Sequence, residues 1–208
     1  MVYEILKETI NATSQTPNVL RDSVLVVFKR ITELLFAPSS NPEMFWIIAP
    51  MIIATLFMTF YFGRYEDEKL GWNTAFGNSM IFLFVVLDIF RKIFESTDPP
   101  SLNNFINDPF YVTLSASLII LGLVMMLFNF YRLWSEKIAF FFSSPLPINV
   151  TIYVVLTIVY TQVPADFLTF VAGIGLFAIF FLFLELLQDF QRLPRKIRWA
   201  INEKNNQK

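Results

Sequence analysis

Five long apolar segments dominate the sequence and limit what the chain can fold into. They cover residues 44–62, 73–94, 110–131, 147–163 and 166–187. An α-helix rises about 1.5 Å per residue, so about 20 apolar residues cross the hydrocarbon core of a bilayer, which is roughly 30 Å thick. The segments therefore predict an all-α polytopic membrane protein with about five transmembrane helices.

The composition supports this prediction. Apolar residues make up 55% of the chain, against about 45–50% in soluble proteins, and charged residues make up 16%, against about 25%. The apolar residues are gathered in blocks instead of recurring at a helical or strand period, which is typical of segments solvated by lipid. We expect a multi-pass protein of the cell membrane.

Segment 147–163 gives the weakest of the five predictions. It is short, it is flanked by Pro145, Pro147 and Pro164, and only the turn Gln-Val-Pro-Ala-Asp separates it from segment 166–187. The two segments read as a tight helical hairpin. Whether 147–163 crosses the bilayer fully or enters and leaves on the same side stays open at this point.

Residues 16–37 predict an amphipathic helix ahead of the spans. Its apolar face is formed by Leu20, Val24, Val27, Phe28, Ile31, Leu34 and Leu35. Its other face carries Arg21, Asp22, Lys29, Arg30 and Glu33. Such a helix lies along the membrane interface or packs on a partner, and docking on the protein's own bundle is the more ordinary alternative. Prolines and serines in residues 37–42 are expected to end it.

Basic residues predict the orientation and divide the chain into three parts. Residues 1–43 form an N-terminal segment, 44–190 the helical bundle and 191–208 a basic tail. The tail carries Arg192, Arg195, Lys196 and Arg198, which places the C-terminus in the cytoplasm and, after five crossings, the N-terminus outside. The same charges could hold anionic lipid head groups. The first 43 residues show no signal-peptide pattern, so we expect the first span to direct insertion.

Small residues at helical spacing predict where spans pack together. Gly71, Ala75 and Ser79 lie four residues apart at the start of the second span, and Gly175 and Ala178 lie on one face of the fifth. Small side chains let helix backbones approach closely, which is a main source of helix association in lipid. The acidic residues 66–68 and an N-cap at Asn73 are expected to complement the start of the second span.

The intracellular ends of the spans carry a candidate polar network. Its members are Asn78, Asn129, Arg132, Glu185 and Arg64. Our hypothesis is that Arg132 or Arg64 holds Glu185, and that the asparagines complete the network. A purely structural role that fixes helix register is the main alternative to an ion or lipid site, because hydrogen bonds between membrane helices are common.

Asp88 is predicted to form a local ion pair at the other end of the second span. Arg91 and Lys92 follow it by three and four residues, the spacing that brings side chains together on a helix. Asp88 and Glu185 lie near opposite membrane faces, roughly 20 Å apart at the helical rise. They are therefore not expected to act as a proton-relay or catalytic pair.

Missing residue types exclude several chemistries. The chain has no cysteine and no histidine, so disulfides, thiol nucleophiles, imidazole-bound metals and Ser-His dyads are excluded. No phosphate-binding loop, dinucleotide fingerprint or selectivity-filter string occurs. A net charge of −1 argues against a nucleic-acid partner. We expect no catalytic residue, no metal site and no cofactor.

These features favour a non-enzymatic protein. The small-residue faces and the N-terminal helix favour a structural or assembly subunit of a larger membrane complex, with membrane lipids and with other subunits or copies of itself as partners. A small oligomeric ion channel or transporter is the alternative, because the fourth segment is broken and the spans contain acidic residues.

Overall fold

The computed structural model describes the backbone of residues 2–65 and 70–206 and the side chains of residues 21–65 and 70–189. Every regular element in these ranges is an α-helix. The helices are α1 (Val2–Ser40), α2 (Glu43–Arg64), α3 (Trp72–Ser79), α4 (Ile81–Phe94), α5 (Asn104–Asn107), α6 (Pro109–Phe130), α7 (Glu136–Phe142), α8 (Pro145–Thr161) and α9 (Phe167–Asn206).

The prediction of an all-α membrane protein with about five spans is confirmed. In the part of the chain that the structure describes, four stretches are long and apolar enough to cross a bilayer: α2, the pair α3–α4 taken as one span, α6, and α9 as far as Asp189. The pair α7–α8 becomes a fifth when it is counted as one span bent by 43°. Many side chains on the flanks of the bundle are apolar and exposed, such as Phe57, Phe84 and Leu186, as is expected for a surface covered by lipid.

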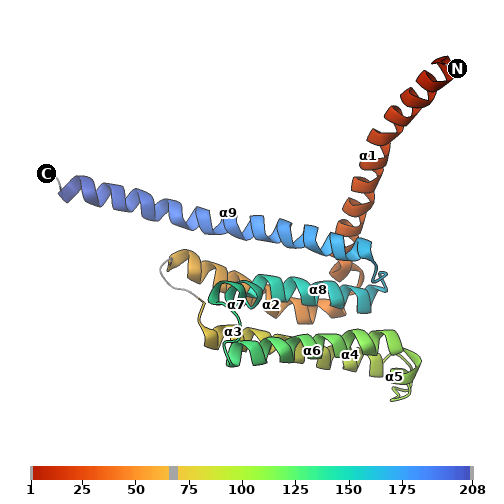
Figure 1. The fold of residues 1–208 in the computed structure, drawn as a ribbon. Helices are drawn as coiled ribbons and strands as arrows, with labels where there is room; N and C mark the ends of the chain where they lie inside the picture. The colour runs from red at the N-terminus through yellow and green to blue at the C-terminus, as the bar shows by residue number, and fades with distance from the viewer. Residues whose placement is uncertain (1, 66–69, 207–208) are drawn as a thin grey trace.

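Helix α8 lies inside the bundle, although the sequence made it the weakest prediction. Ten of its 17 residues are buried, on all sides of the helix. It contacts α1, α2, α4 and α9, and Figure 1 shows it between α9 and the α4–α6 pair. An interior helix is apolar all round and has few contacts with lipid, which is why a short helix can serve here.

The two longest helices extend beyond the bundle. Figure 1 shows the N-terminal part of α1 rising away from the other helices, and α9 continuing past them towards the C-terminus. Helix α9 therefore joins the predicted fifth span, from Phe167, to the predicted tail, as far as Asn206, in one continuous helix. The side chains of Arg192, Arg195, Lys196 and Arg198 lie outside the described residues.

Helix α1 is longer than the predicted helix 16–37, and it ends at Ser40, inside the proline- and serine-rich stretch. Leu34 is fully buried and Ile31 is half-buried, whereas Val24 and Phe28 from the same predicted face are 66% and 61% exposed. The reason is geometric: only the last turns of α1 meet the bundle, and the helix then leads away from it (Figure 1).

The predicted N-cap at Asn73 is wrong. Helix α3 begins at Trp72, and its N-cap is Gly71, in an extended conformation and without a side-chain capping bond. Asn73 lies inside the first turn, where its side chain is exposed. The acidic residues 66–68, predicted to complement this helix end, lie outside the described residues.

Candidate functional site

A buried polar cluster joins three helices at one end of the bundle. Asn129, on the last turn of α6, is 1% exposed. Its Nδ2 donates to Ala75 O and Ser79 Oγ on α3, both at 3.1 Å, and to Ser143 Oγ at the end of α7, at 2.9 Å. Its Oδ1 accepts the indole N–H of Trp134 at 2.9 Å. One carboxamide thus connects α3, α6 and the end of α7.

Asn78 adds a second bond to this group. Its Nδ2 donates to the carbonyl oxygen of Ser143 at 2.8 Å. Ser143 follows the last residue of α7, where carbonyl groups lack the partners that the next helical turn would supply. Asn78 and Asn129 therefore meet at Ser143, and we call Asn78, Ser79, Asn129, Trp134 and Ser143 the Asn129 cluster.

The charged members of the predicted network lie elsewhere. The guanidinium of Arg132 stands 5.7 Å from the ring centre of Trp72, at cation–π distance. Arg132 itself has φ of 53°, in the left-handed region, just after α6 ends. Glu185 and Arg64 are exposed, on α9 and at the end of α2. The structure brings the two asparagines together and gives Arg132 and Glu185 different neighbours.

Glu185 faces a cavity between α2, α8 and α9. The cavity has a volume of about 260 Å³, and Thr55, Thr59, Ser144, Glu185 and Gln188 form the polar part of its wall. A second cavity of about 140 Å³ lies beside it and is almost wholly apolar. We refer to the two, which share Thr55, Leu146 and Leu184 in their walls, as the α2–α9 cavity.

Asn149 of α8 lines the apolar part of the α2–α9 cavity and bonds to α2. Its Nδ2 donates to Thr55 Oγ1 at 2.6 Å and to Met51 O at 3.3 Å. Thr55 in turn donates to Met51 O at 2.8 Å, so the carbonyl receives two side-chain donors. Among the described residues, Asn149 Oδ1 is a buried acceptor with no hydrogen-bond partner. This amide links α8 to α2 through its Nδ2 alone, whereas Asn129 uses both its Nδ2 and its Oδ1.

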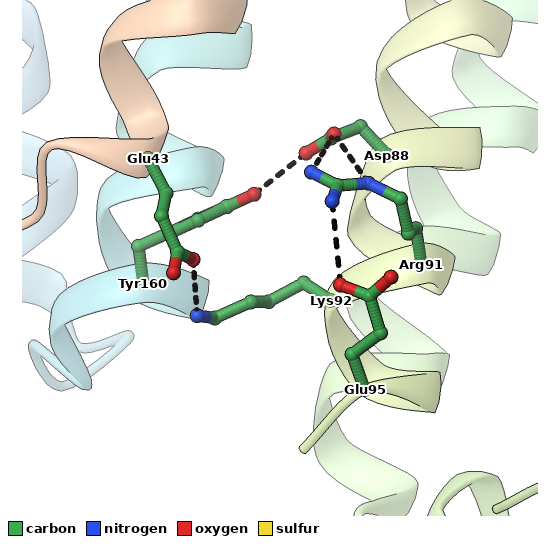
Figure 2. Close-up of polar contacts among 6 residues, drawn as sticks. All are labelled: Glu43, Asp88, Arg91, Lys92, Glu95 and Tyr160. Atoms are coloured by element: carbon green, nitrogen blue, oxygen red, sulfur yellow. Dashed lines mark hydrogen bonds and ion pairs between the residues drawn. The ribbon is translucent and has the colours of Figure 1, made fainter. Parts of the chain in front are cut away.

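A charged cluster lies near the end of α4, at the opposite end of the bundle from α3. Figure 2 shows its residues in close-up. Asp88 on α4 pairs with Arg91 at 2.9 Å, which confirms the predicted local ion pair, and Arg91 also reaches Glu95 at 3.3 Å. The hydroxyl of Tyr160, on α8, donates to Asp88 Oδ2 at 2.6 Å. The carboxylate therefore holds α8 as well as its own helix.

Lys92 turns to another helix instead of joining Asp88. Its Nζ lies 2.6 Å from Glu43 Oε2 on the first residue of α2 and 5.1 Å from the ring centre of Tyr160. Figure 2 shows the lysine passing beneath the tyrosine towards Glu43. We call these six residues, drawn in Figure 2, the Asp88 cluster; it joins α2, α4 and α8.

Helix α1 docks on the bundle through Tyr153 of α8 and Gly175 of α9, among other contacts. Tyr153 Oη on α8 donates to Leu34 O at 2.7 Å. In a regular helix that carbonyl would accept the N–H of Pro38, and proline has none, so the tyrosine supplies the missing donor. Nearby, a Cβ on Gly175 of α9 would lie 2.7 Å from Ile31 Cδ1, so the glycine lets α1 approach.

Arg30 forms the polar edge of this α1 contact. Its Nη1 donates to Thr169 Oγ1 at 3.1 Å, and Nη2 lies 3.8 Å from Asp166. Asp166 precedes α9 and accepts the backbone N–H of Thr169 at 2.8 Å. This bond lowers the pKa of Asp166 below its ordinary value of 3.8, with a smaller contribution from the charge of Arg30.

Of the predicted packing residues, some are buried between helices and others are exposed. Ala75 and Ser79 are fully buried, and their backbone and side-chain oxygens meet Asn129 of α6. Gly71 precedes α3 and is exposed, and Ala178 is exposed on α9.

Gly122, which the sequence did not single out, lies where α6 closely approaches the second span. A Cβ there would lie 2.8 Å from Phe82 Cβ. The signal was a seven-residue spacing of small or polar residues, Ser115, Gly122 and Asn129, which together with Leu118 and Met125 form the buried stripe of α6.

No protein-family model matches the chain, and no curated protein or solved structure matches it. The function is therefore inferred from the contacts described above.

Proposed function

We propose that the chain is a non-enzymatic structural or assembly subunit of a larger membrane complex. The observation that carries the proposal is the extension of α1 and α9 beyond the bundle (Figure 1). Helix α9 has 40 residues, a length of about 60 Å at the helical rise and twice the thickness of the hydrocarbon core. Helices that project this far offer surface that the chain's own bundle does not cover.

The polar side chains of the bundle support the same role. The Asn129 cluster and the Asp88 cluster each join three segments of the chain, and Tyr153 joins α8 to α1. Hydrogen bonds of this kind fix the mutual positions of helices in lipid. A bundle with fixed helix positions and two projecting helices is the form expected of a subunit that positions other subunits of a complex.

Crosslinking from α1 tests this proposal. A photo-reactive residue at Val24, 66% exposed, is expected to capture a different membrane protein, and the same residue at Ile31, packed on Gly175, is expected to capture α9 of its own chain. Purification in mild detergent should recover the same membrane protein that the crosslink at Val24 captures. Recovery of a symmetric homo-oligomer without other proteins contradicts the subunit role.

The second candidate function is a small oligomeric channel or transporter. The observation that favours it is the polar wall of the α2–α9 cavity, where Glu185 and Gln188 stand near Thr55 and Thr59 within spanning helices. Purified protein in liposomes would then conduct ions, and Glu185→Gln would reduce the flux. Absence of flux above that of empty liposomes contradicts this candidate.

The proposed orientation has the C-terminus in the cytoplasm and the N-terminus outside. It follows from the basic tail and from counting α7–α8 as a crossing. The chain has no cysteine, so a single cysteine introduced near either end is the only thiol. Labelling from one side of sealed vesicles should then reach one end only.

A further inference from the structure

The α2–α9 cavity extends along the part of α9 that is long and apolar enough to span a membrane. On α9, the residues in its wall run from Phe177 to Gln188, a rise of about 16 Å. Half the hydrocarbon core of a bilayer is about 15 Å thick. The cavity therefore has the depth of one leaflet, which is the depth that an acyl chain fills.

The polarity of the wall changes along this depth. Ser144, Glu185 and Gln188 lie at one end, and the other end is lined by residues such as Ile48, Ile52 and Phe180. Glu185 lies 18 residues after the start of α9, about 27 Å along the helix, which is close to the far edge of a hydrocarbon core about 30 Å thick that begins where the helix begins. An occupant needs an apolar chain inside and a polar group at this level.

The polar end of the cavity carries an acidic group. Glu185 contributes a carboxylate to the wall, and Ser144 contributes a hydroxyl oxygen that can accept a hydrogen bond. A primary ammonium group offers three N–H donors and a positive charge, whereas a glycerol head group offers no cation.

We propose that the α2–α9 cavity binds a phospholipid with a primary-ammonium head group, its acyl chain between α2, α8 and α9 and its ammonium at Glu185. The site is independent of the proposed subunit role, because it uses no residue of the projecting parts of α1 or α9. The bound lipid would fill the gap that the side chains leave between α2 and α9.

The test uses the full chain in vesicles that contain equal amounts of an ethanolamine and a glycerol phospholipid with the same acyl chains. After gentle extraction, native mass spectrometry counts the lipids that each chain retains. We expect about one ethanolamine lipid per chain, and for Glu185→Gln a drop of about tenfold in its excess over the glycerol lipid. Equal retention of the two lipids by the unaltered chain would overturn the head-group assignment.

Two tryptophan variants on α9 test the cavity itself. Leu184 lines both parts of the cavity, and Leu186, two residues on, is 69% exposed on the flank of the bundle. Leu184→Trp should abolish retention, and Leu186→Trp should keep it, with helical content measured for both. Equal retention in the two variants would show only a shell of surrounding lipid and overturn the site. Loss of a co-purifying protein in Leu184→Trp alone would overturn it in favour of a partner helix.

Discussion

The two ends of the bundle hold their helices together with different chemistry. Asn129 makes neutral hydrogen bonds and is 1% exposed, whereas the Asp88 cluster uses ion pairs whose side chains range from 19% exposed at Asp88 to 65% at Glu43. Both act on the same span, since α3 carries Ala75 at its start and α4 carries Asp88 near its end. The difference follows local access to water: amides serve where water is excluded, and charges where it is near.

The energetic consequence is that the two ends should respond differently to mutation and to salt. Removal of a partner from a dry site leaves a donor or acceptor unsatisfied, at about 1–3 kcal/mol for each group. An exposed ion pair is worth about 0–1 kcal/mol and is screened by salt. The neutral cluster should therefore hold more of the stability.

Asn129→Leu should have the largest effect. The change removes the bonds to Ala75 O, Ser79 Oγ and Ser143 Oγ and leaves the indole N–H of Trp134 without its acceptor. We expect the free energy of unfolding to fall by about 2–3 kcal/mol, measured by reversible unfolding in mixed micelles. Asn103→Leu, at an exposed position before α5, is the matched control and should change little. An equal loss in both variants would break the comparison.

Tyr153→Phe should have the next largest effect. It removes the donor to Leu34 O, whose helical partner position is occupied by Pro38, at a cost of about 1–2 kcal/mol. Pro38→Ala restores an N–H four residues after Leu34 and should make the tyrosine less important. The double variant is therefore expected to lose less than the two single changes add up to. Strict additivity would show that the proline and the tyrosine are not coupled through this carbonyl.

Loss of the Lys92–Glu43 pair should cost less than about 1 kcal/mol, despite a distance of 2.6 Å. Unfolding of Lys92→Gln is compared with the unaltered chain at low and high salt. The difference should shrink as salt rises, and the effect of Asn129→Leu should stay constant. A salt-independent loss at Lys92 would mean that the charged end is as dry as the neutral one.

Much of the fold could be predicted from sequence, because long apolar runs report directly on the solvent around a helix. The spans predicted at 44–62 and 110–131 agree closely with α2 and α6. Helix α8 was harder, because a short apolar helix inside a bundle and one that only enters a membrane have the same composition. Helix α8 is buried on all its sides, and burial depends on neighbours that the sequence does not place.

The sites could be predicted only where the partners are local. The pair of Asp88 and Arg91 follows from a spacing of three residues on one helix, and it is present. The bond between Tyr160 and Asp88 joins residues 72 positions apart, and no local pattern indicates it. Asn129 could be predicted to need partners, but their identity depends on how α3, α6 and α7 pack.

The smallest expected effect concerns pH at the contact between Arg30 and the start of α9. The pKa of Asp166 lies below its ordinary value of 3.8, so its carboxylate stabilises the folded state above that pH, and the contribution is lost as pH falls through the lowered pKa. Distance measurements between spin labels on α1 and α9 should show this contact loosening only below about pH 4. Asp166→Asn should remove that pH dependence. The Asn129 cluster contains no titratable group and should not respond over the same range, so a parallel response there would mean that acid acts on the whole bundle and not on this contact.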